Sequence, residues 1–395
     1  MVRTANAVEA RAASTNPLVA IVEQGQSLWL DYITRDLVRG GELRQLIEED
    51  GLRGLTSNPT IFEKAIGEGD AYNEQLAGLA GQGKDAKAIF EALMVTDIRE
   101  ACDLFRPVFD RTEGRDGLVS IEVAPGLARD TAGTLEEARR LWRTVDRPNA
   151  MVKVPGTAAG LPAIEQLLVE GVNVNVTLLF SRLRHEQVML GYLAALQERA
   201  LRGEPIARLV SVASFFLSRI DTAVDTALEA RIAATGDAAE RGQLRGLLGR
   251  AAIANARLAY ATFRAIFDGD RFAQLRERGA RPQRPLWAST GTKNPAYGDV
   301  LYVEALIGPD TVNTLPQPTL AAFRDHGRAR RTLDGDVEGS RATLAALAEA
   351  GIDLDAVTRR LEDEGVAAFA KSYDVLLAGI ARKCEALQRE EGNAA

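Results

Sequence analysis

The sequence of 395 residues is poor in the residues on which many enzyme sites depend. It has two cysteines, Cys102 and Cys384, and two histidines, His185 and His326. The cysteines lie far apart and lack the C-x-x-C spacing of metal and redox sites, so we expect ordinary free thiols. With so few imidazoles, a zinc site or a histidine-based triad has few candidates. We therefore expect neither a metal nor an organic cofactor, and we assign no chemistry to the histidines.

The chain also lacks an excess of basic charge and a long apolar run. Its net charge is −7 and its isoelectric point is about 5.3, which leaves no broad basic surface for a nucleic-acid backbone. No stretch of about 18 apolar residues is present, and the segment from Met1 to Pro17 lacks the apolar centre of a secretory signal. We expect a soluble cytoplasmic protein, a monomer or homodimer, that binds neither nucleic acid nor a membrane.

Short apolar runs, each followed by a turn and a segment with helical periodicity, recur along the whole chain. This alternation of strand and helix predicts an α/β fold, a closed (β/α)8 TIM barrel of parallel strands. The eight predicted strands are Leu28–Ile33, Leu52–Ser57, Leu118–Val123, Met151–Val154, Val172–Thr177, Leu209–Ser214, Leu286–Thr290 and Val312–Leu315.

Two connections are too long for a single helix, those after the second and the sixth strand, and we expect additional helices in both. The tail beyond Gly335, including Arg341–Glu349 and Val366–Leu387, has helical patterning and should cover one side or end of the barrel. No segment resembles a linker. The sequence therefore predicts one domain over residues 17–395, preceded by an extension over residues 1–16 that we expect to be disordered.

In such a barrel the chemistry lies where strands end, so the polar residues that close the apolar runs are candidates for a site. A barrel interior is normally filled by Val, Ile and Leu, and a convergence of a lysine, two carboxylates and two amides needs a reason beyond packing. The residues in question are Asp31, Asn58, Glu122, Lys153, Asn175, Thr177, Ser214 and Ser289.

Lys153 stands out because lysine is rare in this chain. Of the 48 basic residues seven are lysines and the other 41 are arginines, so arginine is the default cation. An amine can lose its proton and attack a ketone, which a guanidinium cannot do, and apolar neighbours destabilise the charged ammonium. A strand-end lysine that reaches solvent, or that pairs with Glu122, is an equally good interpretation at this point.

Seven motifs in order resemble the transaldolase family, specifically its longer bacterial type, over about Ser27 to Gly327. Together they are highly specific, although each alone is weak. The motifs are LWLDYI (28–33), TSNPTIF (56–62), SIEV (120–123), MVKVPGT (151–157), NVNVTLLFS (173–181), SFFLSRID (214–221) and PLWASTGTKNP (285–295).

This resemblance implies an enzyme that moves a dihydroxyacetone unit between sugar phosphates through a lysine Schiff base, without a cofactor. Lys153 corresponds to the Schiff-base lysine. Asp31 corresponds to the carboxylate that takes the proton from the C4 hydroxyl and later returns it. Glu122 and the hydroxyl of Thr177 correspond to the groups that hold a proton-shuttling water.

The resemblance also implies substrate-binding residues. They are Asn58 and Asn175 for hydroxyls and the intermediate, Phe216 for the cavity wall, and Ser214, Arg219, Ser289 and Lys293 at or near the phosphate. Many members have Ala-Ser-Phe-Arg after the seventh strand. Here the sequence Ala288-Ser289-Thr290-Gly291-Thr292-Lys293 stands instead, so the equivalent of that arginine is open.

Simpler interpretations remain beside these. Asn58 before Pro59 is a common helix start, and Phe216 could be a core residue. Lys293 could be a solvated loop lysine, and Arg219 could form a surface ion pair. A fructose 6-phosphate aldolase type, which uses a tyrosine as acid and base, is the nearest alternative activity. A noncatalytic barrel is a poorer one, because Lys153, Asp31 and Glu122 are all present.

Overall fold

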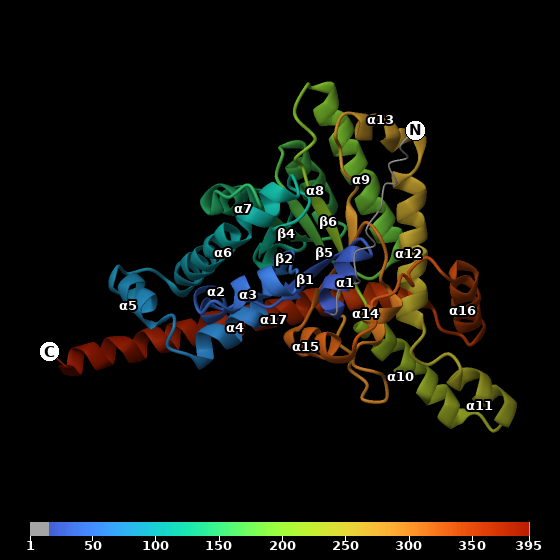
Figure 1. Ribbon diagram of the computed structural model, residues 1–395. Coiled ribbons are helices and arrows are strands. Elements are labelled where there is room, and N and C mark those ends of the chain that lie inside the picture. Colours follow the sequence, from blue (N-terminus) through green and yellow to red (C-terminus); the bar gives the residue numbers. More distant parts are fainter. Residues whose placement is uncertain (1–15, 395) are drawn as a thin grey trace, which may run out of the picture.

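The computed structural model describes residues 16–394 and contains the predicted barrel (Figure 1). Eight parallel strands close into a ring in sequence order, with the first paired to the last. All eight predicted strands are present, with ends shifted by a few residues. The strands are β1 (Gln26–Asp31), β2 (Gly54–Thr56), β3 (Leu118–Glu122), β4 (Ala150–Pro155), β5 (Val174–Leu179), β6 (Ser211–Phe216), β7 (Arg284–Ala288) and β8 (Thr311–Leu315).

Helices surround the barrel and fill the long connections. Between β2 and β3 lie α4 (Pro59–Glu68), α5 (Asn73–Gly81) and α6 (Ala86–Arg111), and between β6 and β7 lie α10 (Ser218–Ala234), α11 (Ala238–Arg245), α12 (Ala251–Phe267) and α13 (Asp270–Glu277). The other helices are α1 (Pro17–Glu23), α2 (Arg35–Arg39), α3 (Glu42–Glu49), α7 (Thr131–Val145), α8 (Gly160–Val169), α9 (Arg182–Leu201), α14 (Leu301–Ala305), α15 (Gln317–His326), α16 (Val337–Glu349) and α17 (Leu354–Ala394).

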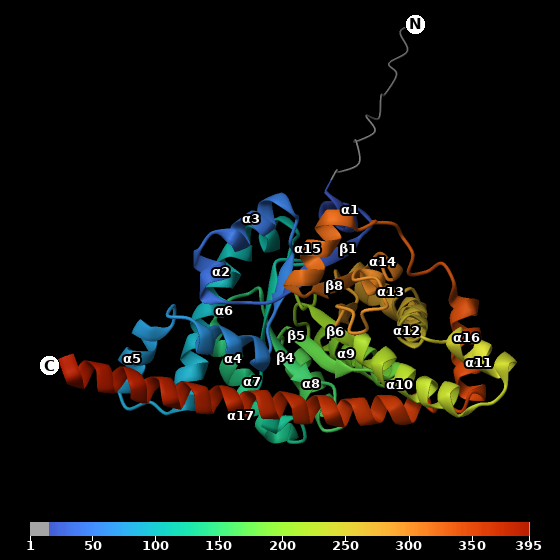
Figure 2. The same cartoon turned by 90° about the horizontal axis from the view of Figure 1, so that it is seen from below.

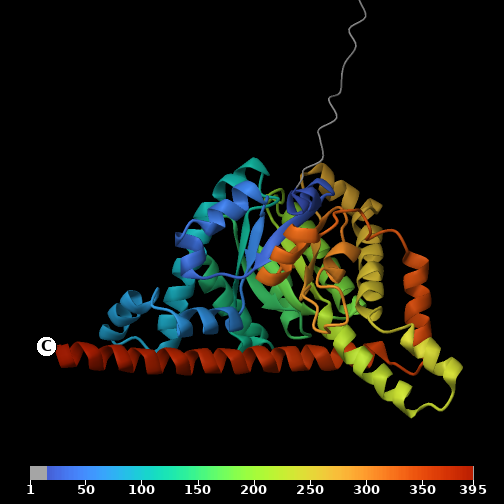
Figure 3. The same ribbon diagram turned by 60° about the horizontal axis from the view of Figure 1, so that its bottom comes forward.

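The last helix, α17, is the longest element of the fold. It runs across the whole width of the molecule (Figures 2 and 3) and packs against α4, α6 and α10. The predicted extension over residues 1–16 falls outside the described residues except for Asn16, whose side chain caps α1 by accepting a hydrogen bond from the Leu18 amide at 2.9 Å. In the described part of the chain, no helix is both long and apolar enough to cross a membrane.

The strands are buried along nearly their whole length, which accounts for their apolar sequences. Side chains alternate between the barrel interior and the helices because a strand has a period of two. The interior is tight near β2, where a Cβ on Gly54 would lie 2.6 Å from the ring of Trp29. Glycine at this position therefore lets the large indole fill the barrel.

The amino-terminal end of the barrel is closed by a buried ion pair. Arg284, the first residue of β7, donates to Asp116 Oδ1 at 2.9 Å and to the Arg115 carbonyl at 2.6 Å. The Ser27 hydroxyl also donates to Asp116, at 2.7 Å, and accepts from the Trp29 indole at 3.0 Å. Burial alone would raise the pKa of Asp116, but Arg284 and Ser27 outweigh it and hold this pKa below its usual value.

Candidate active site

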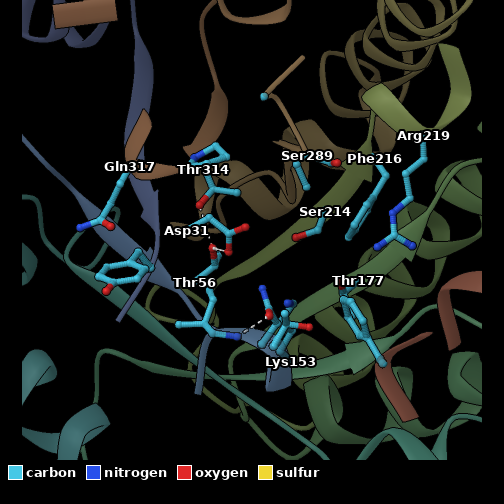
Figure 4. Close-up of a pocket in the computed structure, with 18 of the residues that line it drawn as sticks. Asp31, Thr56, Lys153, Thr177, Ser214, Phe216, Arg219, Ser289, Thr314 and Gln317 are labelled. Atoms are coloured by element: carbon cyan, nitrogen blue, oxygen red, sulfur yellow. Dashed lines mark hydrogen bonds between the residues drawn. The ribbon is translucent and has the colours of Figure 1, made fainter. Parts of the chain in front are cut away.

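A cavity of about 420 Å³ opens at the carboxyl ends of the strands. Nine of the eleven residues predicted from the sequence line it, and Figure 4 shows several of them converging from different strands. These nine are Asp31, Asn58, Lys153, Thr177, Ser214, Phe216, Arg219, Ser289 and Lys293. The other two, Glu122 and Asn175, lie just behind the wall and bind residues of the lining.

Lys153 is held in the middle of β4 with its amine at the floor of the cavity. Its side chain is 5% exposed, so it does not reach solvent. The amine donates to the Ser57 carbonyl at 3.0 Å and to Glu122 Oε2 at 3.2 Å. The register of β3 against β4 places Glu122 directly beside Lys153. Of the simpler interpretations, the pairing with Glu122 is therefore present, and it leaves the amine facing the cavity.

Two carboxyl groups near this amine have shifted proton affinities. Burial raises the pKa of Glu122, and the lysine charge and its hydrogen bond counteract this in part. Burial also raises the pKa of Asp31, against the lysine charge and a hydrogen bond of 2.7 Å from the Thr56 hydroxyl. Carboxyl groups that hold protons more readily than usual are suited to act as acid and base in turn near neutral pH.

Polar side chains of β3, β5 and β6 are joined by hydrogen bonds beneath the cavity. Asn175 donates to the Ser120 hydroxyl at 3.0 Å and accepts from the Ser214 hydroxyl at 2.7 Å. The Thr177 hydroxyl is buried and bonds to no atom of residues 16–394. Because a buried hydroxyl without a partner is costly, this group is suited to hold a water molecule or a substrate atom.

Strained backbone occurs at two strand ends that border the cavity. Leu178, which follows Thr177, has a φ of +59°, and Ser289 at the end of β7 has a φ of +56°. A left-handed conformation at a residue other than glycine costs about 1–3 kcal/mol and tends to be retained at functional sites. At Ser289 it is accompanied by a hydroxyl contact to Ser218 of 2.9 Å.

Two cations border the rim on the β6 and β7 side. Arg219 is half-buried, and within residues 16–394 no salt bridge or hydrogen bond satisfies its guanidinium. The charge of Glu364 acts on Arg219 without a salt bridge between the two side chains. Its guanidinium carbon lies 5.8 Å from the centre of the Phe216 ring, and the two side chains stand side by side, away from Gln317 (Figure 4). Burial lowers the pKa of Arg219, yet an arginine stays charged.

Lys293 is exposed on the loop between β7 and α14. The loop is fixed beyond it, where the Tyr297 hydroxyl donates to Asp225 of α10 at 2.6 Å. The loop that carries Lys293 is thus tied to α10, the helix that carries Arg219. The site therefore combines a buried amine with positive charge at its rim.

Asn58 is a helix cap and also lines the cavity. Its side chain caps α4 by accepting a hydrogen bond from the Ile61 amide at 3.1 Å, and the residue also lines the cavity. Phe216 is likewise both core and wall, with 7% of its surface exposed.

Other lining residues were not singled out from the sequence. The hydroxyls of Thr56 on β2 and Thr314 on β8 are hydrogen-bonded at 2.7 Å beside Asp31. Thr56 opens the motif TSNPTIF (56–62), so the sequence did point to it. Tyr32, Lys64, Gln317 and Phe369 also line the cavity. Phe369 belongs to α17, far from the motifs in sequence, and nothing in its own pattern distinguishes it from a core residue.

No group of three or more His, Cys, Asp and Glu side chains in residues 16–394 is arranged to hold a metal ion. The potential ligands nearest to the amine are Glu122 and Asp31, and both face the lysine charge.

Comparison with known proteins agrees with this geometry. The family model of transaldolase/fructose-6-phosphate aldolase matches residues 28–380. A transaldolase of Thiobacillus denitrificans is 52% identical over 356 residues, which are 90% of this chain and 97% of the relative. Transaldolases of Acidothermus cellulolyticus and Mycobacterium tuberculosis are 48% and 46% identical and cover 96% and 92% of this chain, with 100% and 96% of their own lengths matched.

Proposed function

The chain belongs to the transaldolase/fructose-6-phosphate aldolase family and is an enzyme of the transaldolase type, and we propose that it works through a Schiff base on Lys153. In this proposal it transfers a dihydroxyacetone unit from sedoheptulose 7-phosphate or fructose 6-phosphate to glyceraldehyde 3-phosphate or erythrose 4-phosphate. These are the exchanges of the pentose phosphate pathway.

The reaction begins at the amine of Lys153. In its neutral form the amine attacks the ketose carbonyl, and loss of water from the carbinolamine gives an imine. Glu122, 3.2 Å from the amine, takes up and returns the protons that these steps require. The free hydroxyl of Thr177 holds the water through which the protons pass. The raised pKa of Glu122 supports this role, because a carboxyl group that is easily protonated can serve as both acid and base.

Asp31 acts at the bond that breaks. As a base it removes the proton of the C4 hydroxyl, the bond between C3 and C4 opens, and an aldose leaves. The three remaining carbons stay on Lys153 as an enamine, because the protonated imine accepts the electron pair. An acceptor aldehyde then takes the place of the aldose, and Asp31 returns its proton to the new hydroxyl. Asn58, Asn175 and Ser214 orient the sugar hydroxyls and the intermediate.

The phosphate of each substrate rests at the rim between α10 and the loop after β7. Arg219 offers a planar fork of donors, and Lys293 offers a compact charge on the loop after β7. Ser289 and the backbone amides around Gly291 add neutral donors. The guanidinium of Arg219 has no salt bridge or hydrogen bond within residues 16–394, and the charge of Glu364 acts on it only at longer range. This supports the assignment, because a half-buried cation favours a closer anionic ligand.

The observation that carries the proposal is the buried amine of Lys153. It faces the cavity near the carboxyl groups of Glu122 and Asp31, both of which have raised pKa values. The test is to incubate the protein with fructose 6-phosphate and borohydride and to locate the adduct by mass spectrometry. We expect a reduced dihydroxyacetone adduct on Lys153 that disappears when erythrose 4-phosphate is added first. An adduct on another lysine would refute the mechanism.

A second candidate is the release of free dihydroxyacetone, an aldolase activity that the family also includes. A tyrosine, Tyr32, lines the cavity next to Asp31 and is the observation in its favour. The two activities are separated by supplying fructose 6-phosphate alone. A transaldolase should make one equivalent of glyceraldehyde 3-phosphate and stop, whereas an aldolase continues to release both products.

A further inference from the structure

Helix α17 lies outside the eight strand-helix units and contributes one side chain, Phe369, to the cavity. Buried residues spaced four or seven apart form a stripe along one face of the helix. They are Leu361, Gly365, Phe369, Leu376 and Ile380. Leu376 and Ile380 continue the stripe beyond the cavity lining and pack into the core. The stripe therefore brings a residue from near the end of the chain to the catalytic amine.

Contacts on both sides of Phe369 fix the height of α17 above the cavity. On one side a Cβ on Gly365 would lie 3.0 Å from Leu178, so the helix backbone approaches the end of β5 closely. On the other side Thr60 donates to the Ser372 hydroxyl at 2.9 Å, and Lys383 donates to the Ile66 carbonyl at the same distance. The Phe369 ring is thus held in place rather than resting on a free surface.

The ring of Phe369 faces the amine of Lys153. The amine lies 5.7 Å from the ring centre, within the range of a cation–π contact, and Phe369 is 7% exposed. The hydrogen-bond acceptors of the amine are polar: the carbonyl of Ser57, the residue after β2, and the carboxyl group of Glu122 on β3. An aromatic face over this nitrogen stabilises a cation there and excludes water from its neighbourhood.

We propose that Phe369 is a specificity-determining residue that favours transfer of the three-carbon unit to an aldehyde over its release by water. The proposal rests on the Schiff-base function given above. Both fates start from the enamine on Lys153. In transfer, the enamine carbon forms a bond to the aldehyde carbon, whose oxygen takes a proton, and the nitrogen becomes an iminium.

In release, the same enamine carbon takes a proton that originates in solvent, and the nitrogen again becomes an iminium. Water then adds to the carbon of this iminium, the bond between carbon and nitrogen breaks, and dihydroxyacetone leaves with the lysine amine restored. Because both fates end in hydrolysis, the step that distinguishes them is protonation of the enamine carbon. An apolar ring above the nitrogen keeps solvent-borne acid away from that carbon until an aldehyde binds.

The test compares two substitutions of nearly equal size, Phe369→Met and Phe369→Gln, in the full chain. The measured quantity is the rate of dihydroxyacetone release from fructose 6-phosphate alone, divided by the rate of sedoheptulose 7-phosphate formation when erythrose 4-phosphate is present. Glutamine brings a polar amide to the place of the ring and should raise this ratio by about tenfold, the order expected for loss of a desolvated contact. Methionine should keep the ratio within about threefold of the parent, because it remains apolar.

Leu376→Ala is the control for loosening of the helix. Leu376 is buried on the same face of α17 but does not line the cavity. We expect this variant to lower the unfolding midpoint and leave the ratio unchanged. Equal ratios in the Met and Gln variants, or an equal rise in Leu376→Ala, would overturn the proposal. Failure of the underlying function is recognised separately, because the parent would then give no borohydride adduct on Lys153.

Discussion

The two ends of the barrel each hold a buried ion pair, and the pairs differ in nearly every respect. At the amino-terminal end, Arg284 and Asp116 are joined at 2.9 Å, and Ser27 and the Arg115 carbonyl satisfy further polar atoms. At the carboxyl end, Lys153 and Glu122 are 3.2 Å apart beside an open cavity. In the pair at the amino-terminal end, the pKa of Asp116 is held below its usual value. At the carboxyl end, burial raises the pKa of Glu122 in spite of Lys153.

In the proposed mechanism, this difference separates a structural pair from a reactive one. A guanidinium cannot lose its proton, so the pair of Arg284 and Asp116 stays charged, and each buried charge needs the other as its counter-ion. A lysine amine and a carboxyl group can exchange a proton and both become neutral, which leaves a nucleophile in the cavity. In the proposed mechanism, the same charges in the same barrel therefore serve stability at one end and chemistry at the other.

The largest effect should come from Lys153→Arg. The variant keeps the charge beside Glu122 but cannot form an imine, so we expect a loss of activity on the order of 10⁴-fold or more. Its unfolding midpoint should change little. The measurement is coupled-assay turnover together with borohydride trapping. Substantial remaining turnover would mean that the reactive pair lies elsewhere.

Asp116→Ala should have the next largest effect, on stability rather than on chemistry. It leaves the buried guanidinium of Arg284 without a counter-ion, which costs about 3–5 kcal/mol. Urea unfolding measures this loss. The fraction that remains folded should have kcat close to the parent value, because Asp116 is at the opposite end from the cavity. A large fall in kcat per folded molecule would contradict the division between the two ends.

The pH dependence of the same pair has a definite sign. The pKa of Asp116 is lower in the folded protein than its ordinary value of 3.8. Its contribution to stability is therefore complete above that ordinary value and is lost as the pH falls through the folded pKa. The difference in unfolding free energy between the parent and Asp116→Asn should accordingly shrink below pH 3.8.

Glu122→Gln tests the reactive pair from the other partner. Loss of a positioned acid and base should lower kcat by about 10²–10³-fold. The raised pKa of Glu122 places the acid limb of the parent pH–rate profile above the ordinary glutamate value of 4.5, because the ionised form is the base. This limb should change shape in the variant, leaving the contribution of Asp31, whose pKa is also raised. An unaltered profile would remove Glu122 from the mechanism.

The rim should show smaller effects that depend on the substrate. Arg219→Ala and Lys293→Ala should each raise KM for fructose 6-phosphate and erythrose 4-phosphate by about 10–100-fold, the range expected for one charge-assisted hydrogen bond. Turnover of unphosphorylated dihydroxyacetone or glyceraldehyde should barely change. If either variant keeps the parent KM, that residue is not an anchor and the phosphate rests on the loop backbone and the other cation.

The reactive end was far more predictable from the sequence than the structural end. Strand periodicity gave the eight strands, and polar residues such as Asp31, Lys153 and Ser214 interrupt apolar runs, where a packed interior gives no reason for them. The pair of Arg284 and Asp116 carried no such signal. Each is one of many charged residues near a strand boundary, and only the closure of the barrel brings β7 to Asp116, two residues before β3.

The same limit applies to residues that reach the cavity from outside the barrel. Phe369 has the spacing of an ordinary buried position on an amphipathic helix, and the docking of α17 alone decides which turn meets Lys153. Glu122 and Asn175 were identified correctly as polar strand residues, but their place just behind the cavity wall depends on how side chains pack. Local pattern therefore predicts which strands carry polar groups, and tertiary packing decides which groups touch a ligand.

The smallest effect should come from Arg284→Lys, the mirror image of Lys153→Arg. A lysine at this position keeps the charge beside Asp116, but its single amine replaces a fork that now reaches both Asp116 and the Arg115 carbonyl. Loss of one hydrogen bond should cost about 1 kcal/mol in urea unfolding. Turnover and both KM values should stay at the parent level, because the substitution is at the end of the barrel away from the cavity. The two swaps together are the sharpest form of the comparison, since each exchanges the same two side chains. Lys153→Arg should abolish activity and leave stability almost unchanged. Arg284→Lys should lower stability slightly and leave activity unchanged. A stability loss in Arg284→Lys as large as in Asp116→Ala would show that the paired hydrogen bonds of the guanidinium, and not its charge, stabilise the amino-terminal end of the barrel.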